Sequence, residues 1–102
     1  MRPEPKYTVA ASADVGSTVR HYDDQRANLG TEFLDELERV TLHIRNSPLL
    51  STLVDAPVRR VLLRRFPFGV FFISGSSTEA DVIVAVLDLR QDPEAIRQAY
   101  ER

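Results

Sequence analysis

The sequence predicts an α+β fold in which an antiparallel helical hairpin packs on a small, mainly antiparallel four-stranded sheet. Three observations carry this prediction. Two amphipathic helical segments follow a short N-terminal strand, three strand-like runs come after them, and a short helix follows the last strand. Because each long helix has one apolar stripe and a tight turn joins the two, both stripes must be buried on a common surface.

The first elements are a short strand and a helix. Side chains alternate in character over Tyr7–Ser12, which predicts a half-buried strand. Ser12 is then placed to cap a helix that runs from Ala13 to about Asn28. Gly30-Thr31 predicts the turn into the next helix.

The second helix has the clearest amphipathic pattern. Glu32 falls in its first turn, where a negative charge suits the helix dipole. Asn46-Ser47-Pro48 ends it, because the residue before proline is disfavoured in helical geometry. Its apolar stripe consists of Phe33, Leu34, Leu37, Val40 and Ile44.

Three strand-like runs follow a loop at Leu49–Pro57. Pro67 separates the first two runs, and Gly75–Glu79 separates the last two. The runs are Val58–Phe66, Phe68–Ser74 and Asp81–Leu89. A short helix at Pro93–Tyr100 follows, with Asp92 as its cap.

The last two strands are apolar on both of their faces, as expected of central strands that are covered on both sides. The hairpin covers one side. The short helix at Pro93–Tyr100 offers few apolar side chains for the other side. Either a partner protein or the loop Leu49–Pro57 must therefore cover it.

Length and composition indicate one domain over residues 1–102. The chain is 43% hydrophobic and 27% charged, which is typical of globular proteins. It has no cysteine, which excludes disulfides, thiolate nucleophiles and sulfur-ligated metals. We expect no metal and no cofactor. The first residues lack the apolar core of a signal peptide, and no stretch approaches the roughly 20 apolar residues of a membrane span, so we expect a cytoplasmic protein without a membrane partner.

Charge limits the class of partner. The formal net charge is -2, whereas nucleic-acid affinity depends on many cations that release phosphate counterions. We therefore expect no sequence-specific DNA binding by this chain alone. Lys6 is the single lysine among 13 basic residues, and the arginines suit planar, bidentate contacts.

Arginine is concentrated in the otherwise apolar first strand run. Both of its faces carry arginine, so we expect at least one pair to face away from the hairpin. The arginines are structural if they reach acids such as Asp55, Asp81 or Asp88. They are functional if they attract an acidic partner segment.

Several phrases, in this order, resemble the RelE/ParE superfamily of type II toxins, and the ParE-like branch in particular. The phrases are Leu29–Arg39, Val58–Arg60, Leu63–Phe68, Ala85–Leu87 and Asp92-Pro93. The resemblance spans nearly the whole chain and implies a RelE/ParE-like fold. It also implies a bacterial cytoplasmic toxin, of the kind linked to plasmid stabilization, that a cognate antitoxin neutralises.

The resemblance leaves the target open. ParE-like toxins inhibit DNA gyrase by binding, whereas RelE-like toxins cleave messenger RNA on the ribosome. The acidic pI and the lack of a histidine on the predicted sheet favour the gyrase-directed class. A third reading is a non-toxic family member that acts only in an antitoxin complex.

Each of these functional hypotheses predicts a set of site residues. We favour no catalytic residue. If the chain is a nuclease, the candidates are Arg65, Asp88, Arg90 and Tyr100, although Arg90 should lower the pKa of Asp88 and make it a weak base. His21 and His43 fall on the hairpin. For antitoxin or target binding the candidates are Arg59, Arg60, Arg64, Arg65, Phe68, Phe72, Arg90 and Tyr100.

Overall fold

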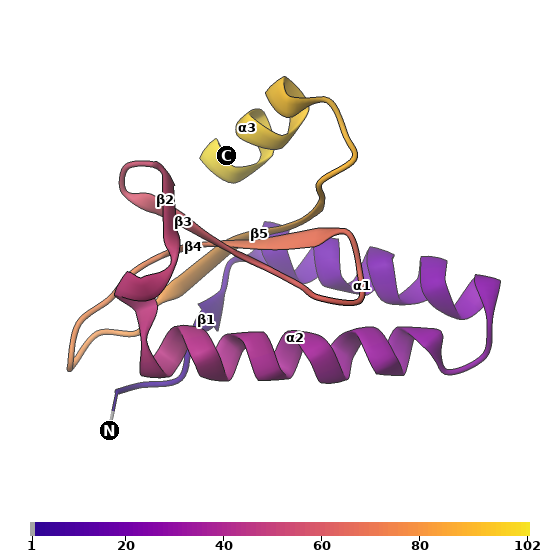
Figure 1. Cartoon of the computed structure of the whole chain (residues 1–102), viewed down its shortest axis with the longest axis horizontal. Coiled ribbons are helices and arrows are strands. Elements are labelled where there is room, and N and C mark those ends of the chain that lie inside the picture. The colour runs from indigo at the N-terminus through magenta and orange to yellow at the C-terminus, as the bar shows by residue number, and fades with distance from the viewer. Residues whose placement is uncertain (1) are drawn as a thin grey trace.

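A computed structural model describes residues 2–102 and shows three layers (Figure 1). The helical hairpin lies below the sheet, and a short C-terminal helix lies above it. The helices are α1 (Val9–Gln25), α2 (Leu29–Asn46) and α3 (Pro93–Glu101), with a 3₁₀ turn η1 (Pro48–Leu50). The strands are β1 (Lys6–Tyr7), β2 (Thr52–Asp55), β3 (Val58–Leu62), β4 (Phe68–Ile73) and β5 (Val82–Asp88).

The sheet has five strands in the order β1-β5-β4-β3-β2. Only β1 pairs in parallel, with β5, and the other neighbours are antiparallel. The fifth strand is β2, in the segment predicted as a loop. It forms a hairpin with β3 in which Leu53 lies opposite Arg59.

The chain enters α1 earlier than predicted. The predicted strand at Tyr7–Ser12 shrinks to two residues, because the Thr8 side chain accepts a hydrogen bond from the Ala11 N–H at 3.1 Å and caps a helix that begins at Val9. Ser12 therefore lies inside the helix and not at its cap.

The turn between the helices also differs from the prediction. Asn28, with φ 70°, makes the turn, whereas Gly30 lies inside α2. A Cβ on Gly30 would lie 2.7 Å from the Val19 carbonyl oxygen, so this glycine permits close approach of the two helices. The Asp23 carboxylate accepts a hydrogen bond from the Gly30 N–H at 2.8 Å and joins the helices at that point.

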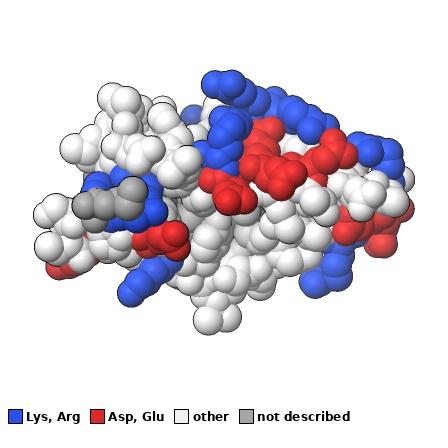
Figure 2. All heavy atoms as spheres, turned by 90° about the horizontal axis from the view of Figure 1, so that it is seen from below, with Lys and Arg blue, Asp and Glu red and all other residues white. Residues whose placement is uncertain are grey.

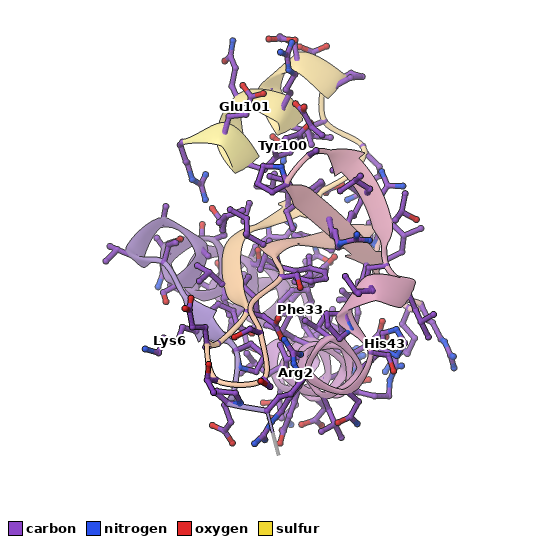
Figure 3. The ribbon with its side chains drawn as sticks, turned by 90° about the vertical axis from the view of Figure 1, so that its left-hand side faces the viewer. Arg2, Lys6, Phe33, His43, Tyr100 and Glu101 are labelled. Atoms are coloured by element: carbon purple, nitrogen blue, oxygen red, sulfur yellow. The ribbon has the colours of Figure 1, made fainter. Side chains whose placement is uncertain are left out.

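The main core lies between the hairpin and the sheet. The predicted stripe of α2 is confirmed at four positions, whereas Leu34 is 41% exposed. Phe33 is fully buried and lies on the hairpin side of the sheet (Figure 3). The aromatic rings of Tyr22, Phe66 and Phe68 surround it.

The far side of the sheet is covered by the chain itself. Of the two covers that the sequence left open, the structure supports the segment 49–57, which packs there through Val54 together with α3. Tyr100 of α3 stacks on Phe71 with ring centroids 5.0 Å apart, on the side opposite Phe33 (Figure 3). Val54 of β2 and Ile96 of α3 pack against the same cluster. A helix with few apolar residues suffices because the strand β2 supplies part of the cover.

No helix within residues 2–102 combines the length and the apolarity that crossing a membrane requires.

Candidate protein-binding site

The two arginines on β3 point to opposite sides of the sheet. Arg59 lies opposite Phe72 on the hairpin side and donates a hydrogen bond to the Ser51 carbonyl oxygen at 2.9 Å. Arg60 lies opposite Phe71 on the α3 side, and its Nε is buried without a hydrogen-bond partner among residues 2–102. One strand arginine, and not a pair, therefore faces away from the hairpin.

The other two arginines belong to a turn, because β3 ends at Leu62 and not at Phe66. The buried Glu36 carboxylate of α2 accepts hydrogen bonds from the backbone N–H groups of Arg64 and Arg65. The Arg65 side chain donates to Glu32 at 2.9 Å. Two acids of α2 thus hold the arginine turn, defined as residues 63–67, against the hairpin.

The pKa of Glu32 is lowered, chiefly by the hydrogen bond from Arg65 and next by that from Arg26. A carboxyl group with a depressed folded pKa contributes stability above its unfolded pKa, and that contribution is lost as the pH falls through the folded pKa. We therefore expect Glu32→Gln to destabilise the protein at roughly pH 7 and to have a smaller effect at roughly pH 3. Urea denaturation at both values measures this, and an equal effect at both would contradict it.

The four residues proposed for a nuclease do not converge. Asp88 and Arg90 form an ion pair at 2.7 Å, and Asp88 lines a cleft together with α1 on the hairpin side. Tyr100 lies on the α3 side against Phe71. Arg65 is bound to Glu32 of α2. A base and an acid on opposite sides of a sheet do not act on one phosphate.

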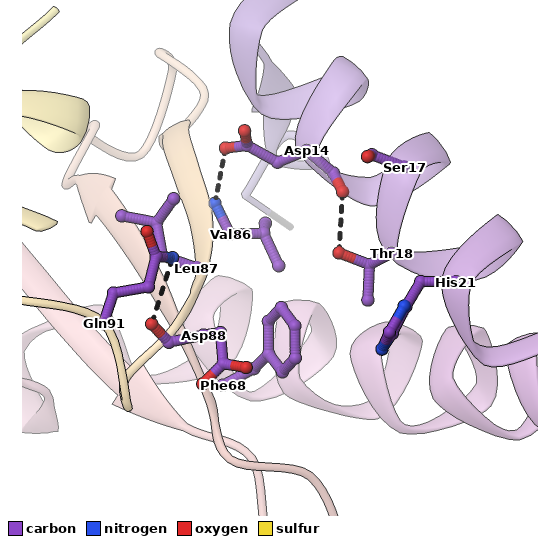
Figure 4. A pocket seen from close by; sticks show the side chains of 9 residues that line it. All are labelled: Asp14, Ser17, Thr18, His21, Phe68, Val86, Leu87, Asp88 and Gln91. Carbon is purple, nitrogen blue, oxygen red and sulfur yellow. Dashed lines mark hydrogen bonds between the residues drawn. The ribbon is translucent and has the colours of Figure 1, made fainter. Parts of the chain in front are cut away.

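The cleft between α1 and β5 holds several polar side chains, but most of them already have partners (Figure 4). Asp14 accepts hydrogen bonds from the Val86 N–H at 3.0 Å and from Arg102 at 2.5 Å. Arg90 lowers the pKa of Asp88 through a side-chain hydrogen bond. The ring nitrogen Nε2 of His21 lies 2.8 Å from the Gln25 amide. Because hydrogen bonds and ion pairs already occupy the carboxylates of Asp14 and Asp88, neither is placed to act as a general base.

No group of three or more His, Cys, Asp or Glu side chains within residues 2–102 is arranged to hold a metal ion.

Two of the proposed binding residues lie inside the core. Phe72 is fully buried and Phe68 is 7% exposed, and both belong to the cluster between the hairpin and the sheet. Their position follows from the strand alternation, which turns them toward α1 and α2. Both side chains are therefore part of the core and offer no surface to a partner.

A groove that the sequence did not indicate runs between α2 and β3. Val40 and Val61 line it and belong to the edge of the main core. Leu42 of α2 and Leu62 of β3 also line it and are 55% and 52% exposed. Arg64 of the arginine turn is a further lining residue. Leu62 sits in an apolar strand run, so the sequence alone offers no signal that its side chain is solvent-exposed.

Figure 2 shows the molecule from below. The largest group of acidic side chains lies near the middle of this view with basic side chains along its border, smaller acidic groups lie toward both ends, and wide areas carry no charge. His43 lies on the flank of α2 that faces the β3 edge (Figure 3).

Comparison with known proteins identifies the fold. No protein-family model and no curated protein sequence matches this chain. A chain of the chromosomal ParDE TA system from P. aeruginosa superposes on it with a TM-score of 0.72 and 16% sequence identity, covering 85% of this chain and 96% of that chain.

The chain has the ParE-like fold.

The fold class predicted from sequence is thereby confirmed. The likeness includes parts of both the helical hairpin and the sheet, because a match to 85% of 102 residues cannot leave out either of them. Within the ParE-like fold, the arginine turn and the groove both lie at the edge where α2 meets β3.

Proposed function

We propose that this chain is the toxin of a bacterial toxin–antitoxin pair, that it inhibits DNA gyrase in the cytoplasm by binding, and that a cognate antitoxin protein neutralises it. The observation that carries this proposal is the fold shared with a chain of a ParDE system over 96% of that chain. The phrases that resemble ParE-like toxins add support, because they fall on α2, β3, the arginine turn and β5.

The geometry favours a protein that acts by binding a partner over one that cleaves RNA. Cleavage of RNA through its 2′-hydroxyl needs a base, an acid and cations around one phosphate. Here Asp88 is tied to Arg90, and Tyr100 is stacked on the other side of the sheet. Arg64 is exposed and forms no ion pair among residues 2–102, so its charge is available to an acidic partner.

A supercoiling assay tests the target. We expect the purified chain to inhibit purified DNA gyrase when present in excess, while messenger RNA stays intact in cells that express it without antitoxin. Normal supercoiling at high excess of the chain would contradict the gyrase target. Cuts within codons of translated messages would instead favour a ribosome-dependent nuclease, and harmless expression with normal supercoiling would favour a chain that acts only in an antitoxin complex.

A further inference from the structure

One arginine of the sheet carries a buried polar atom that has no partner. The Nε of Arg60, on the α3 side of β3, is buried and forms no hydrogen bond among residues 2–102. No carboxylate of these residues forms an ion pair with the Arg60 guanidinium. The one other such side-chain atom within residues 2–102 is the uncharged Ser51 hydroxyl. An unsatisfied buried donor destabilises a fold, so a charged one calls for an explanation.

Gly69 of β4 makes room for the Arg60 side chain. A Cβ on Gly69 would lie 3.3 Å from Arg60 Cδ and 3.1 Å from Leu89 Cδ2, so both side chains lie over this glycine. The apolar stem of Arg60 is thus packed on the sheet, whereas the residue as a whole is only half-buried. Its terminal nitrogens are neither buried nor hydrogen-bonded within residues 2–102, so the charged tip lies at the surface.

Apolar surface lies beside this charge. Leu62 projects from the same face of β3 as Arg60, because side chains alternate along a strand. It is 52% exposed, and its cross-strand neighbour Gly69 has no side chain to cover it. Leu62 and Leu89 line one hollow above the arginine turn, and no Asp or Glu lines that hollow. We call Arg60, Leu62 and Leu89 the Arg60 ledge.

The Arg60 ledge suits a carboxylate of a protein better than a nucleic-acid backbone. The formal net charge is -2, whereas phosphate binding depends on many cations. Arg65 and Arg90 are already paired with acids of this chain, so no row of free cations continues from the ledge along these residues. Its two leucines match apolar side chains of a protein. A second copy of the chain would bring two unpaired Arg60 side chains together, which is unfavourable.

We propose that the Arg60 ledge contacts the protein target, and that Arg60 pairs there with a carboxylate of DNA gyrase. On binding, the guanidinium turns outward from the sheet. Its Nε, which has no partner in the free chain, then donates to the carboxylate together with a terminal nitrogen, in the bidentate geometry that arginine favours. The inference rests on the proposed function, since that function supplies the target.

A supercoiling assay with purified gyrase tests the ledge. Arg60→Met keeps an apolar stem and removes both the charge and the unsatisfied donor. We expect it to raise the concentration of chain that half-inhibits gyrase by about 10-fold or more, as loss of a hot-spot arginine does. Arg60→Lys restores the charge without the planar fork and should recover only part of the inhibition. Arg20→Met, at an exposed position of α1, is the control and should stay within about 2-fold of wild type.

Urea denaturation separates a functional arginine from a structural one. Because methionine removes a buried unsatisfied donor, Arg60→Met should leave the urea midpoint unchanged or raise it. Arg59→Met is the contrast on the same strand. It removes the hydrogen bond to the Ser51 carbonyl oxygen and should lower the midpoint. If Arg60→Met lowered the midpoint as much as Arg59→Met, Arg60 would be structural and the proposal would be overturned.

The remaining outcomes are distinguishable. If the wild-type chain does not inhibit gyrase, the proposed target fails and the ledge assignment fails with it. If wild type and Arg60→Met inhibit gyrase equally well, the target stands and the ledge assignment is wrong. If wild type binds a fluorescein-labelled DNA duplex without gyrase and Arg60→Met does not, the ledge binds phosphate and the protein contact is overturned. A wild-type dimer that Arg60→Met dissociates would make a second copy the occupant and would also overturn it.

Discussion

Replacing Phe33 with alanine is expected to lower the free energy of unfolding by about 4 kcal/mol, because removing a fully buried aromatic ring leaves a cavity that the core cannot close. The ring packs edge-on against Phe66 at 5.3 Å and Phe68 at 5.2 Å, and Tyr22 lies 5.7 Å away. Three aromatic neighbours from α1, the arginine turn and β4 lose contacts together.

Chemical denaturation followed by circular dichroism measures this change. For a domain of this size, the same loss should lower the melting temperature by about 20 °C. Leu34→Ala is the matched control, since Leu34 is the next residue of α2 but is 41% exposed, and we expect it to cost less than about 1 kcal/mol. Similar losses for both variants would show that the core is not centred on Phe33.

The core around Phe33 was predictable because its signal is periodic. Residues Phe33, Leu37, Val40 and Ile44 recur at helical spacing, and the structure buries all four. The flanking elements were not predictable in the same way. Thr8 caps α1 through one side-chain hydrogen bond, and this local contact prevails over the alternation of residues 7–12.

Tertiary contacts explain the remaining differences in the fold. Gly30 resembles a turn residue, yet it lies inside a helix because α1 approaches too closely for a side chain. The segment 52–55 has no strong strand pattern, and it becomes β2 only because β3 offers an open edge. Such pairings depend on residues distant in space, which periodicity within one segment does not report.

The candidate site was also predictable only in part. The sequence indicated that arginine is concentrated around β3, and the arginine turn indeed lies at the surface. Arg65 is paired with Glu32 of α2, and the backbone of the arginine turn is held by Glu36 of the same helix; both acids are about thirty residues away in sequence, a distance bridged only by the fold. The strand alternation also placed Phe68 and Phe72 in the core, and it left Leu62 exposed at the end of β3.

Glu36 joins α2 to the arginine turn. It is a buried acid whose carboxylate accepts hydrogen bonds from the backbone of that turn. Its side chain is 6% exposed, and it accepts the N–H groups of Arg64 and Arg65. Removing a buried carboxylate that accepts hydrogen bonds from two backbone N–H groups lowers the free energy of unfolding substantially. The carboxylate also fixes where the Arg64 side chain leaves the backbone, beside the groove.

Replacing the buried Glu36 with alanine is therefore expected to lower the free energy of unfolding by about 3 kcal/mol, since two part-buried N–H groups lose their acceptor. Amide hydrogen exchange at residues 64 and 65 should accelerate by more than the global destabilisation explains. Glu36→Gln should have an intermediate effect, because its amide keeps one accepting oxygen but directs an NH₂ group at a donor. Urea denaturation and exchange measured by NMR give both readouts.

Glu38→Ala is the matched control, since Glu38 is exposed on the same helix two residues away, and we expect a change within about 0.5 kcal/mol. If Glu36→Ala matched this control in stability and in amide exchange, the arginine turn would hold its shape without the acid.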